Sequence, residues 1–239
     1  MGLLRSAATI SSFTFLSRIT GLIRDVLIAR AFGAGPLTDA FWVAFRIPNL
    51  LRRLFAEGAF SQAFVPILGQ VKKEGDREHV QLLIDRVALL LSLALMVVTL
   101  IGMLATPWIV TVIASGLRAA ERQAEFTATV WMTRLMFPYI VCMSLVALAS
   151  GVLNTWSRFA VPAFTPLLLN FSMIAASLWL APHLSPPIYA LAVGVIVGGV
   201  LQLAIQWVAL KRLGFAPRFN LKLREAWQNP TVRRVLRQM

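Results

Sequence analysis

The sequence has few of the residues on which enzymes and metalloproteins depend. Only 14% of its 239 residues are charged, one is cysteine and two are histidine. The single thiol, Cys142, excludes a disulfide or a multi-thiolate metal site within the chain. His79 and His183 are isolated, and no acidic metal-binding motif accompanies them. No G-x-x-x-x-G-K run is present, so the loop that binds ATP phosphates in many proteins is missing. We therefore expect no catalytic residue, no metal and no cofactor, and we do not predict an enzyme.

Apolar residues are abundant instead. They make up 58% of the chain, whereas soluble domains have about 45–50% apolar and about 25% charged residues. The composition predicts a polytopic membrane protein surrounded by lipid. The net charge of +13 could indicate a nucleic-acid partner in a soluble protein. In a membrane protein Lys and Arg concentrate in cytoplasmic loops, so we expect no nucleic-acid partner.

Six stretches are each long enough to cross a bilayer as a helix, which takes about 20 residues. The predicted fold class is therefore all-α, with six transmembrane helices within residues 1–213 and a basic cytoplasmic tail over residues 214–239. The six stretches are residues 3–32, 37–70, 79–114, 124–153, 159–180 and 187–213.

Basic residues alternate between the predicted loops. The loop at 71–78 and the tail are rich in Lys and Arg, whereas the loops at 33–38 and 181–186 have none. Because basic loops stay in the cytoplasm, we expect the N-terminus, the loops at 71–78 and 154–158, and the tail on the cytoplasmic side.

The second stretch is too long for a straight span. Its 34 residues would extend about 51 Å as a helix, against a hydrocarbon core of about 30 Å. Pro48 predicts a kink near residues 45–48, and Gly21 is a candidate break in the first stretch. Broken helices at membrane depth line cavities, so we expect a cavity beside these two stretches.

Arginines within the first two stretches outnumber the acidic residues. An ionised side chain at the centre of a lipid-embedded helix costs about 2.5–3.5 kcal/mol, so these residues should face protein, water or an anionic ligand. Arg52 and one of Arg18 or Arg24 are the candidates for unpaired cations. The predicted charge network consists of Arg18, Arg24, Asp25, Asp39, Arg46, Arg52, Arg53 and Glu57.

Arginine suits a phosphate ligand. Its planar fork donates two parallel hydrogen bonds and keeps its charge when buried, so forks converging from several helices could hold a diphosphate. Two alternatives remain open. Arg52 and Arg53 could extend to the membrane interface, and Arg18 and Arg24 could form structural pairs with Asp25 or Asp39.

A family resemblance supports the anionic ligand. Residues 17–68 contain the strings FGAG, TDAF, PNLLRR and FAEGAFSQAFVP, and later segments read LNTWSRFAVPAFTPLLLN and GGVLQL. With these strings the chain resembles the MurJ (MviN) lipid II flippases of the multidrug/oligosaccharidyl-lipid/polysaccharide exporter superfamily, over essentially its whole length. The resemblance implies a transporter that moves lipid II, the undecaprenyl-diphosphate-linked peptidoglycan precursor, across the bacterial inner membrane by alternating access.

The resemblance also implies roles for particular residues. By motif, Arg18, Arg24 and Arg52 correspond to arginines that the family needs for function, and Asp25, Asp39 and Glu57 to charged positions lining its cavity. Family members have fourteen helices in two lobes, and this sequence matches the first lobe, so a second transmembrane lobe is an expected partner. Other hypotheses are an ion-coupled exporter of small molecules that uses Asp25 or Asp39, a membrane enzyme acting on a lipid diphosphate, and a lobe that does not transport.

Overall fold

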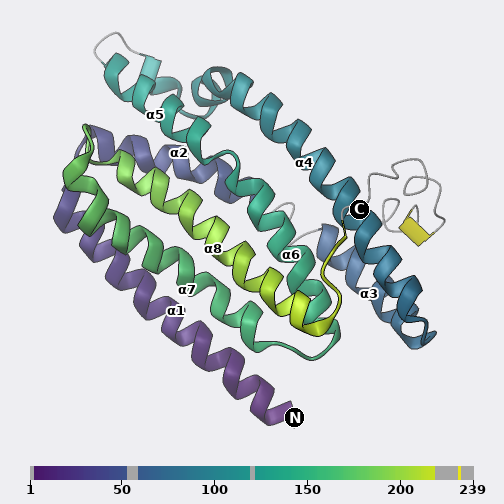
Figure 1. Ribbon diagram of the computed structural model, residues 1–239. Helices are drawn as coiled ribbons and strands as arrows, with labels where there is room; N and C mark the ends of the chain where they lie inside the picture. Colours follow the sequence, from purple (N-terminus) through teal and green to yellow (C-terminus); the bar gives the residue numbers. More distant parts are fainter. Residues whose placement is uncertain (1–2, 53–58, 119–121, 219–230, 233–239) are drawn as a thin grey trace.

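The computed structural model describes residues 3–52, 59–118, 122–218 and 231–232 (Figure 1). Every regular element within these ranges is helical, which confirms the predicted all-α class. The main helices are α1 (Leu3–Phe32), α2 (Pro36–Arg52), α3 (Ala59–Lys73), α4 (Arg77–Ile113), α5 (Gln123–Met136), α6 (Tyr139–Thr155), α7 (Ala160–Ala175) and α8 (Tyr189–Leu213). One short helical turn, Ser115–Arg118, lies between α4 and α5. Two more, Ala176–Leu180 and Ala181–His183, lie between α7 and α8.

Four helical stretches of the described chain are long and apolar enough to cross a membrane: Arg77–Ile113, Gln123–Thr155, Ala160–His183 and Tyr189–Leu213. The chain is thus a polytopic membrane protein, but the expected count of six spans is not confirmed. Helix α1 has 30 residues, yet its serines, threonines and charged residues lower its hydropathy. Helices α2 and α3 have 17 and 15 residues. Both are shorter than a membrane span, which needs about 20 residues.

Gly21 does not interrupt α1, which runs unbroken from Leu3 to Phe32. The expected break was therefore wrong. A single glycine costs a helix only about 1 kcal/mol relative to alanine, which a long helix packed on a neighbour tolerates. A Cβ atom at Gly21 would lie 3.6 Å from Asn170 Nδ2 on α7. The glycine therefore marks a point of close approach between α1 and α7.

Prolines act differently in the second and fourth predicted stretches. Pro48 lies inside α2, which continues to Arg52, so it does not end the helix, and a kink there stays a prediction. The fourth stretch divides in two, because α5 ends at Met136 and α6 begins at Tyr139, with Pro138 at the junction. A proline has no amide hydrogen to donate to the preceding turn, which accounts for this division.

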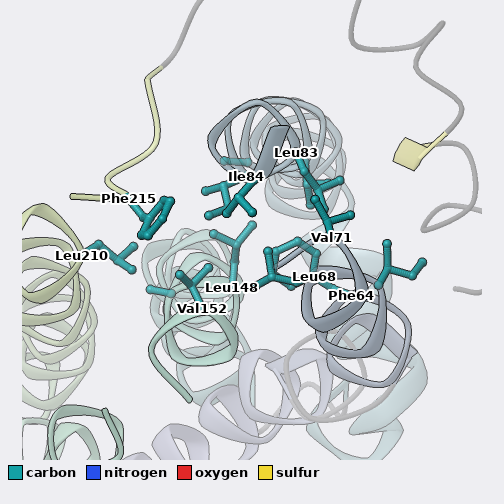
Figure 2. Packing of buried hydrophobic residues seen from close by; sticks show 14 of the residues in the cluster. Phe64, Leu68, Val71, Leu83, Ile84, Leu148, Val152, Leu210 and Phe215 are labelled. Atoms are coloured by element: carbon teal, nitrogen blue, oxygen red, sulfur yellow. The ribbon is translucent and has the colours of Figure 1, made fainter. Parts of the chain in front are cut away.

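The helices pack side by side, with α7 between α1 and α8 (Figure 1). Helix α8 also packs on α6, while α2 packs on α5. One buried cluster joins α3, α4, α6 and α8 near their basic ends and includes Phe64, Leu68, Ile84, Val152 and Leu210 (Figure 2). Phe215, just beyond α8, belongs to the same cluster. The first residues of the predicted tail are therefore part of the packed lobe.

Helix α4 is the longest element. Its 37 residues extend about 56 Å at 1.5 Å per residue, well beyond the hydrocarbon core of about 30 Å. Asp76 caps its first turn, because the carboxylate accepts hydrogen bonds from the backbone N–H groups of Glu78 (2.9 Å) and His79 (3.2 Å). This cap satisfies two donors that the helix itself leaves without acceptors.

Candidate site at the junction of α1 and α7

Asn170 of α7 connects the candidate arginine helix to the rest of the lobe. Its side chain is 5% exposed, and its Nδ2 donates to the Ser17 carbonyl oxygen and to Thr20 Oγ1, both at 3.0 Å. Thr20 in turn donates to carbonyl oxygens one turn earlier in α1. A buried amide with satisfied donors fixes the distance and rotation of one helix against another. Asn170 therefore sets the position of the middle of α1.

The same amide holds Arg24. Its Oδ1 accepts a hydrogen bond of 2.8 Å from Arg24 Nη1. On the other side of the guanidinium, Nε and Nη2 both donate to Asp25 Oδ1, at 2.9 and 2.8 Å. The Arg24 side chain is 16% exposed and the Asp25 side chain 51%. Three of the five guanidinium N–H groups are thus engaged, which leaves one on each terminal nitrogen without a partner among the described residues.

The Arg24–Asp25 contact bears on the alternatives left open by the sequence. Arg24 does pair with a carboxylate, but with its immediate neighbour in α1, at an exposed site. Arg18 is exposed and makes no ion pair or hydrogen bond with any residue in the described part of the chain. Of the two candidate arginines Arg18 and Arg24, Arg18 is therefore the one without a partner among the described residues.

The described charged residues of α2 lie apart from this junction. Asp39 is in the first turn of α2, and Arg46 is exposed further along the helix. Arg46 lines a cavity of about 460 Å³ together with Asn49 and Ile113. Helix α1 packs mainly on α7 and α2 mainly on α5, rather than on each other. The described charged residues of α1 and α2 therefore lie on two different helix pairs, α1 with α7 and α2 with α5.

Three predicted residues lie beyond what can be placed. Arg53 and Glu57 fall outside the described residues, and for Arg52, the last residue of α2, only the backbone is described. Their proposed place in the charge network stays a prediction. Within the described ranges, no three His, Cys, Asp or Glu side chains gather where they could hold a metal ion.

Sequence reasoning missed the role of Asn170. It appeared only as the last letter of the string LNTWSRFAVPAFTPLLLN. A usable signal was present, because Asn170 is a lone amide within the apolar run of α7. Polar side chains inside a membrane segment face protein or water and need partners. Its partners, however, lie about 150 positions earlier in the sequence, so the sequence alone does not identify them.

The fold and this junction define a class of protein: a polytopic, all-helical membrane protein in which an arginine-bearing helix, α1, packs on α7. Comparison with known proteins identifies the family. The sequence model of the family "Lipid II flippase MurJ" matches residues 28–239, so the chain belongs to the MurJ lipid II flippase family. The match begins after Arg18 and Arg24, so it does not include these two arginines.

Those relatives align over nearly the whole chain. Lipid II flippase MurJ of Burkholderia cenocepacia is 54% identical over 239 residues, which are 100% of this chain and 46% of that protein. A probable lipid II flippase MurJ of Vibrio cholerae is 39% identical over 96% of this chain and 44% of that protein. The chain thus spans less than half the length of these relatives.

A solved structure supports the fold. It is described as lipid II flippase MurJ in an inward closed conformation, and it matches with a TM-score of 0.74 at 24% identity. The match covers 96% of this chain and 46% of that one. The helices described here therefore have the arrangement of about half of a known flippase fold.

Proposed function

We propose that this chain forms one lobe of a lipid II flippase and that Arg18, Arg24 and Arg52 hold the diphosphate of the lipid. Residues 1–213 form the transmembrane part of the lobe, and residues 214–239, the first of which pack against it, lead toward a second transmembrane lobe. Rocking of two lobes would move the undecaprenyl-diphosphate-linked precursor from the cytoplasmic to the periplasmic leaflet of the inner membrane. Family membership supports the substrate class, and the geometry around Arg24 supports the diphosphate contact.

The surroundings of Arg24 are suited to exchange of one anion for another. Asp25 is half exposed, and an exposed ion pair contributes only about 0–1 kcal/mol. A diphosphate carries more charge than a carboxylate and accepts a bidentate contact from guanidinium, so it can displace Asp25. Asn170 is buried and would keep its bond to Arg24 during the exchange. The arginine would then stay in position whether or not the lipid is bound.

The pairing of Asp25 disfavours the small-molecule exporter. Such a transporter needs an acidic group inside the membrane that is free to bind a proton, a sodium ion or a cationic drug. The Asp25 carboxylate instead accepts two hydrogen bonds from Arg24. Arg18 adds an unpaired positive charge on the same helix, and this positive surplus repels cations.

The position of the basic residues supports the proposed orientation. Lys72, Arg77 and Arg158 lie in the two loops that we assign to the cytoplasm, and Arg212 lies in the last turn of α8, next to the tail. An anionic head group entering from that side would move outward with a membrane potential that is negative inside, at about 2.3 kcal/mol per charge per 100 mV. Voltage could therefore contribute to the transport step.

Lipid II transport by the full-length protein tests this proposal. Arg24→Ala should abolish rescue of a bacterial strain depleted of its own lipid II flippase, and Arg24→Lys should restore rescue only in part, because lysine lacks the fork. Arg30→Ala is the matched control: Arg30 is an exposed arginine in the last turn of the same helix. Membrane insertion and expression of each variant are measured in parallel.

The result that contradicts the diphosphate contact is equally concrete. If Arg24→Ala, inserted at parental levels, supports growth and lipid II export as well as Arg30→Ala does, Arg24 does not hold the substrate. If neither the parent nor any variant exports lipid II in the full-length protein, the flippase assignment itself is wrong.

A further inference from the structure

A groove on the outer face of α7 and α8 combines a basic end with apolar walls. At the end where α6 and α8 finish, a cavity of about 470 Å³ is lined by Arg158 and Arg212 together with Val161, Ile205 and Val208. Arg158 comes from the turn between α6 and α7, and Arg212 from the last turn of α8. No acidic residue lines this cavity. Its charge is therefore positive on one side of an otherwise apolar surface.

Backbone turns fix both arginines without using their side chains. Ser157 adopts a φ of 57°, and the N–H of Arg158 donates to the Leu153 carbonyl oxygen at 2.8 Å. Gly214 adopts a φ of 83° beyond α8, and the N–H of Phe215 donates to the Leu210 carbonyl oxygen at 3.1 Å. These are Schellman-type helix ends, in which the backbone satisfies the last carbonyl groups. The two guanidinium groups are thus not needed to cap α6 or α8.

Two other basic residues at this end of the lobe, Lys72 and Arg77, have partners. Lys72 Nζ donates to the Thr155 carbonyl oxygen and lies 4.7 Å from the centre of the Trp156 ring. The Arg77 guanidinium lies 5.2 Å from the centre of the Phe215 ring. The guanidinium groups of Arg158 and Arg212, by contrast, make no ion pair or hydrogen bond with any side chain or backbone atom of the described residues. They are two cations available to one ligand.

Apolar side chains of α8 lead from this cavity to a second one, and we call the two cavities together the α7–α8 groove. Residues Val197, Leu201, Ile205 and Val208 follow one face of α8 at helical spacing. Val197 and Leu201 line a second cavity of about 470 Å³ between α7 and α8, which is almost entirely apolar. From Arg212 to Leu201 helix α8 rises about 16 Å. The hydrocarbon core of a bilayer is about 30 Å thick, so this rise is close to half of it. This distance matches the acyl chain of one leaflet.

We propose that this α7–α8 groove binds an anionic phospholipid of the bilayer. The phosphate lies between Arg158 and Arg212, and an acyl chain lies along Val208, Ile205 and Leu201. Guanidinium groups recognise phosphate oxygens by paired hydrogen bonds, and basic pockets between membrane helices are suited to anionic lipid head groups. The site is separate from Arg24 and does not depend on which substrate the lobe carries.

Lipid retention by the full-length protein in detergent tests the proposal. Native mass spectrometry compares retained phosphatidylglycerol and phosphatidylcholine of identical acyl composition. The parent should retain phosphatidylglycerol preferentially. Each arginine near a lipid surface should contribute about fivefold in affinity, so Arg158→Ala with Arg212→Ala should lower phosphatidylglycerol affinity by about 25-fold and leave phosphatidylcholine unchanged.

Two further variants separate the groove from a general basic surface. Lys211→Ala removes the adjacent charge, which lies outside the cavity lining, and should change affinity by less than about twofold. Val208→Trp keeps both arginines but fills the apolar part of the cavity with a larger side chain. It should therefore lower the affinity for the lipid without changing the binding of inorganic phosphate. If the double arginine variant binds phosphatidylglycerol as tightly as the parent does, the proposal is wrong. It is also wrong if Lys211→Ala lowers that affinity as much as the double variant does. Displacement of phosphatidylglycerol by inorganic phosphate alone, or more tightly by undecaprenyl diphosphate, would reassign the site to a free anion or to the transported lipid.

Discussion

Replacing Asn170 with alanine removes the amide that joins α7 to α1. Three hydrogen bonds are lost: two from Nδ2 to Ser17 and Thr20, and one to Oδ1 from Arg24. The change leaves the rest of α7 intact, because alanine is a good helix former. The effect on the lobe therefore comes from the junction itself.

The contacts set the size of the effect. A neutral hydrogen bond contributes about 0.5–1.5 kcal/mol net, and one to a charged group about 1.5–3 kcal/mol. The three bonds together would reach about 2.5–6 kcal/mol, but the Arg24 side chain is 16% exposed and water can replace its lost acceptor. We expect a loss of about 2–4 kcal/mol in the free energy of unfolding, which lowers Tm by about 6–12 °C at about 3 °C per kcal/mol.

Thermal unfolding of the purified full-length protein measures this loss, and lipid II export measures its functional result. We expect export to fall together with Tm, because Arg24 loses the partner that orients it. Asn154→Ala is the control, since Asn154 is an exposed asparagine at the end of α6. If Asn170→Ala unfolds within about 2 °C of Asn154→Ala, the amide does not join the two helices energetically, and the reasoning about Arg24 loses its support.

Two other predictions concern packing and capping, each read out by thermal unfolding. Gly194→Ala should destabilise the lobe by about 1–3 kcal/mol, because its new Cβ would lie 2.9 Å from Ala176 Cβ. Gly69→Ala, with no atom within 4 Å of its new Cβ, should be neutral or stabilising, and equal Tm values for the two would contradict the close packing of α7 on α8. Asp76→Ala should cost about 0.5–2 kcal/mol by removing the cap of α4. Glu74→Ala, at an exposed residue outside the cap, should cost much less, and a similar loss in both would argue against capping.

The helical segments were largely predictable, because their signals are local. The predicted stretch 79–114 corresponds to Arg77–Ile113, and 187–213 to Tyr189–Leu213. Continuous apolar runs of this length have few alternatives to a membrane helix. The effects of glycine and proline were harder to judge. Gly21 was expected to break α1, but α7 packs against it, whereas Pro138 divides a stretch that hydropathy presents as continuous.

The candidate site was predictable only in part. The arginine surplus of the first stretch is a composition signal, and it led to Arg18 and Arg24 directly. Whether a given arginine pairs depends on rotamers and on distant helices. The sequence left open whether Arg18 or Arg24 pairs with Asp25, and the structure shows that Asp25 bonds to Arg24. Asn170 lies 146 positions from its arginine partner, and no local pattern encodes that contact.

Because α4 is long, a small change in its tilt moves its two ends by several ångströms. With 37 residues it reaches about 28 Å on either side of its midpoint, so its capped end stands clear of the hydrocarbon. A tilt of about 10° around that midpoint would displace each tip sideways by about 5 Å. Angular changes too slight to notice at the bilayer centre would thus become measurable excursions at the tips. A spin label on Glu78, in the first exposed turn, is well placed to record them.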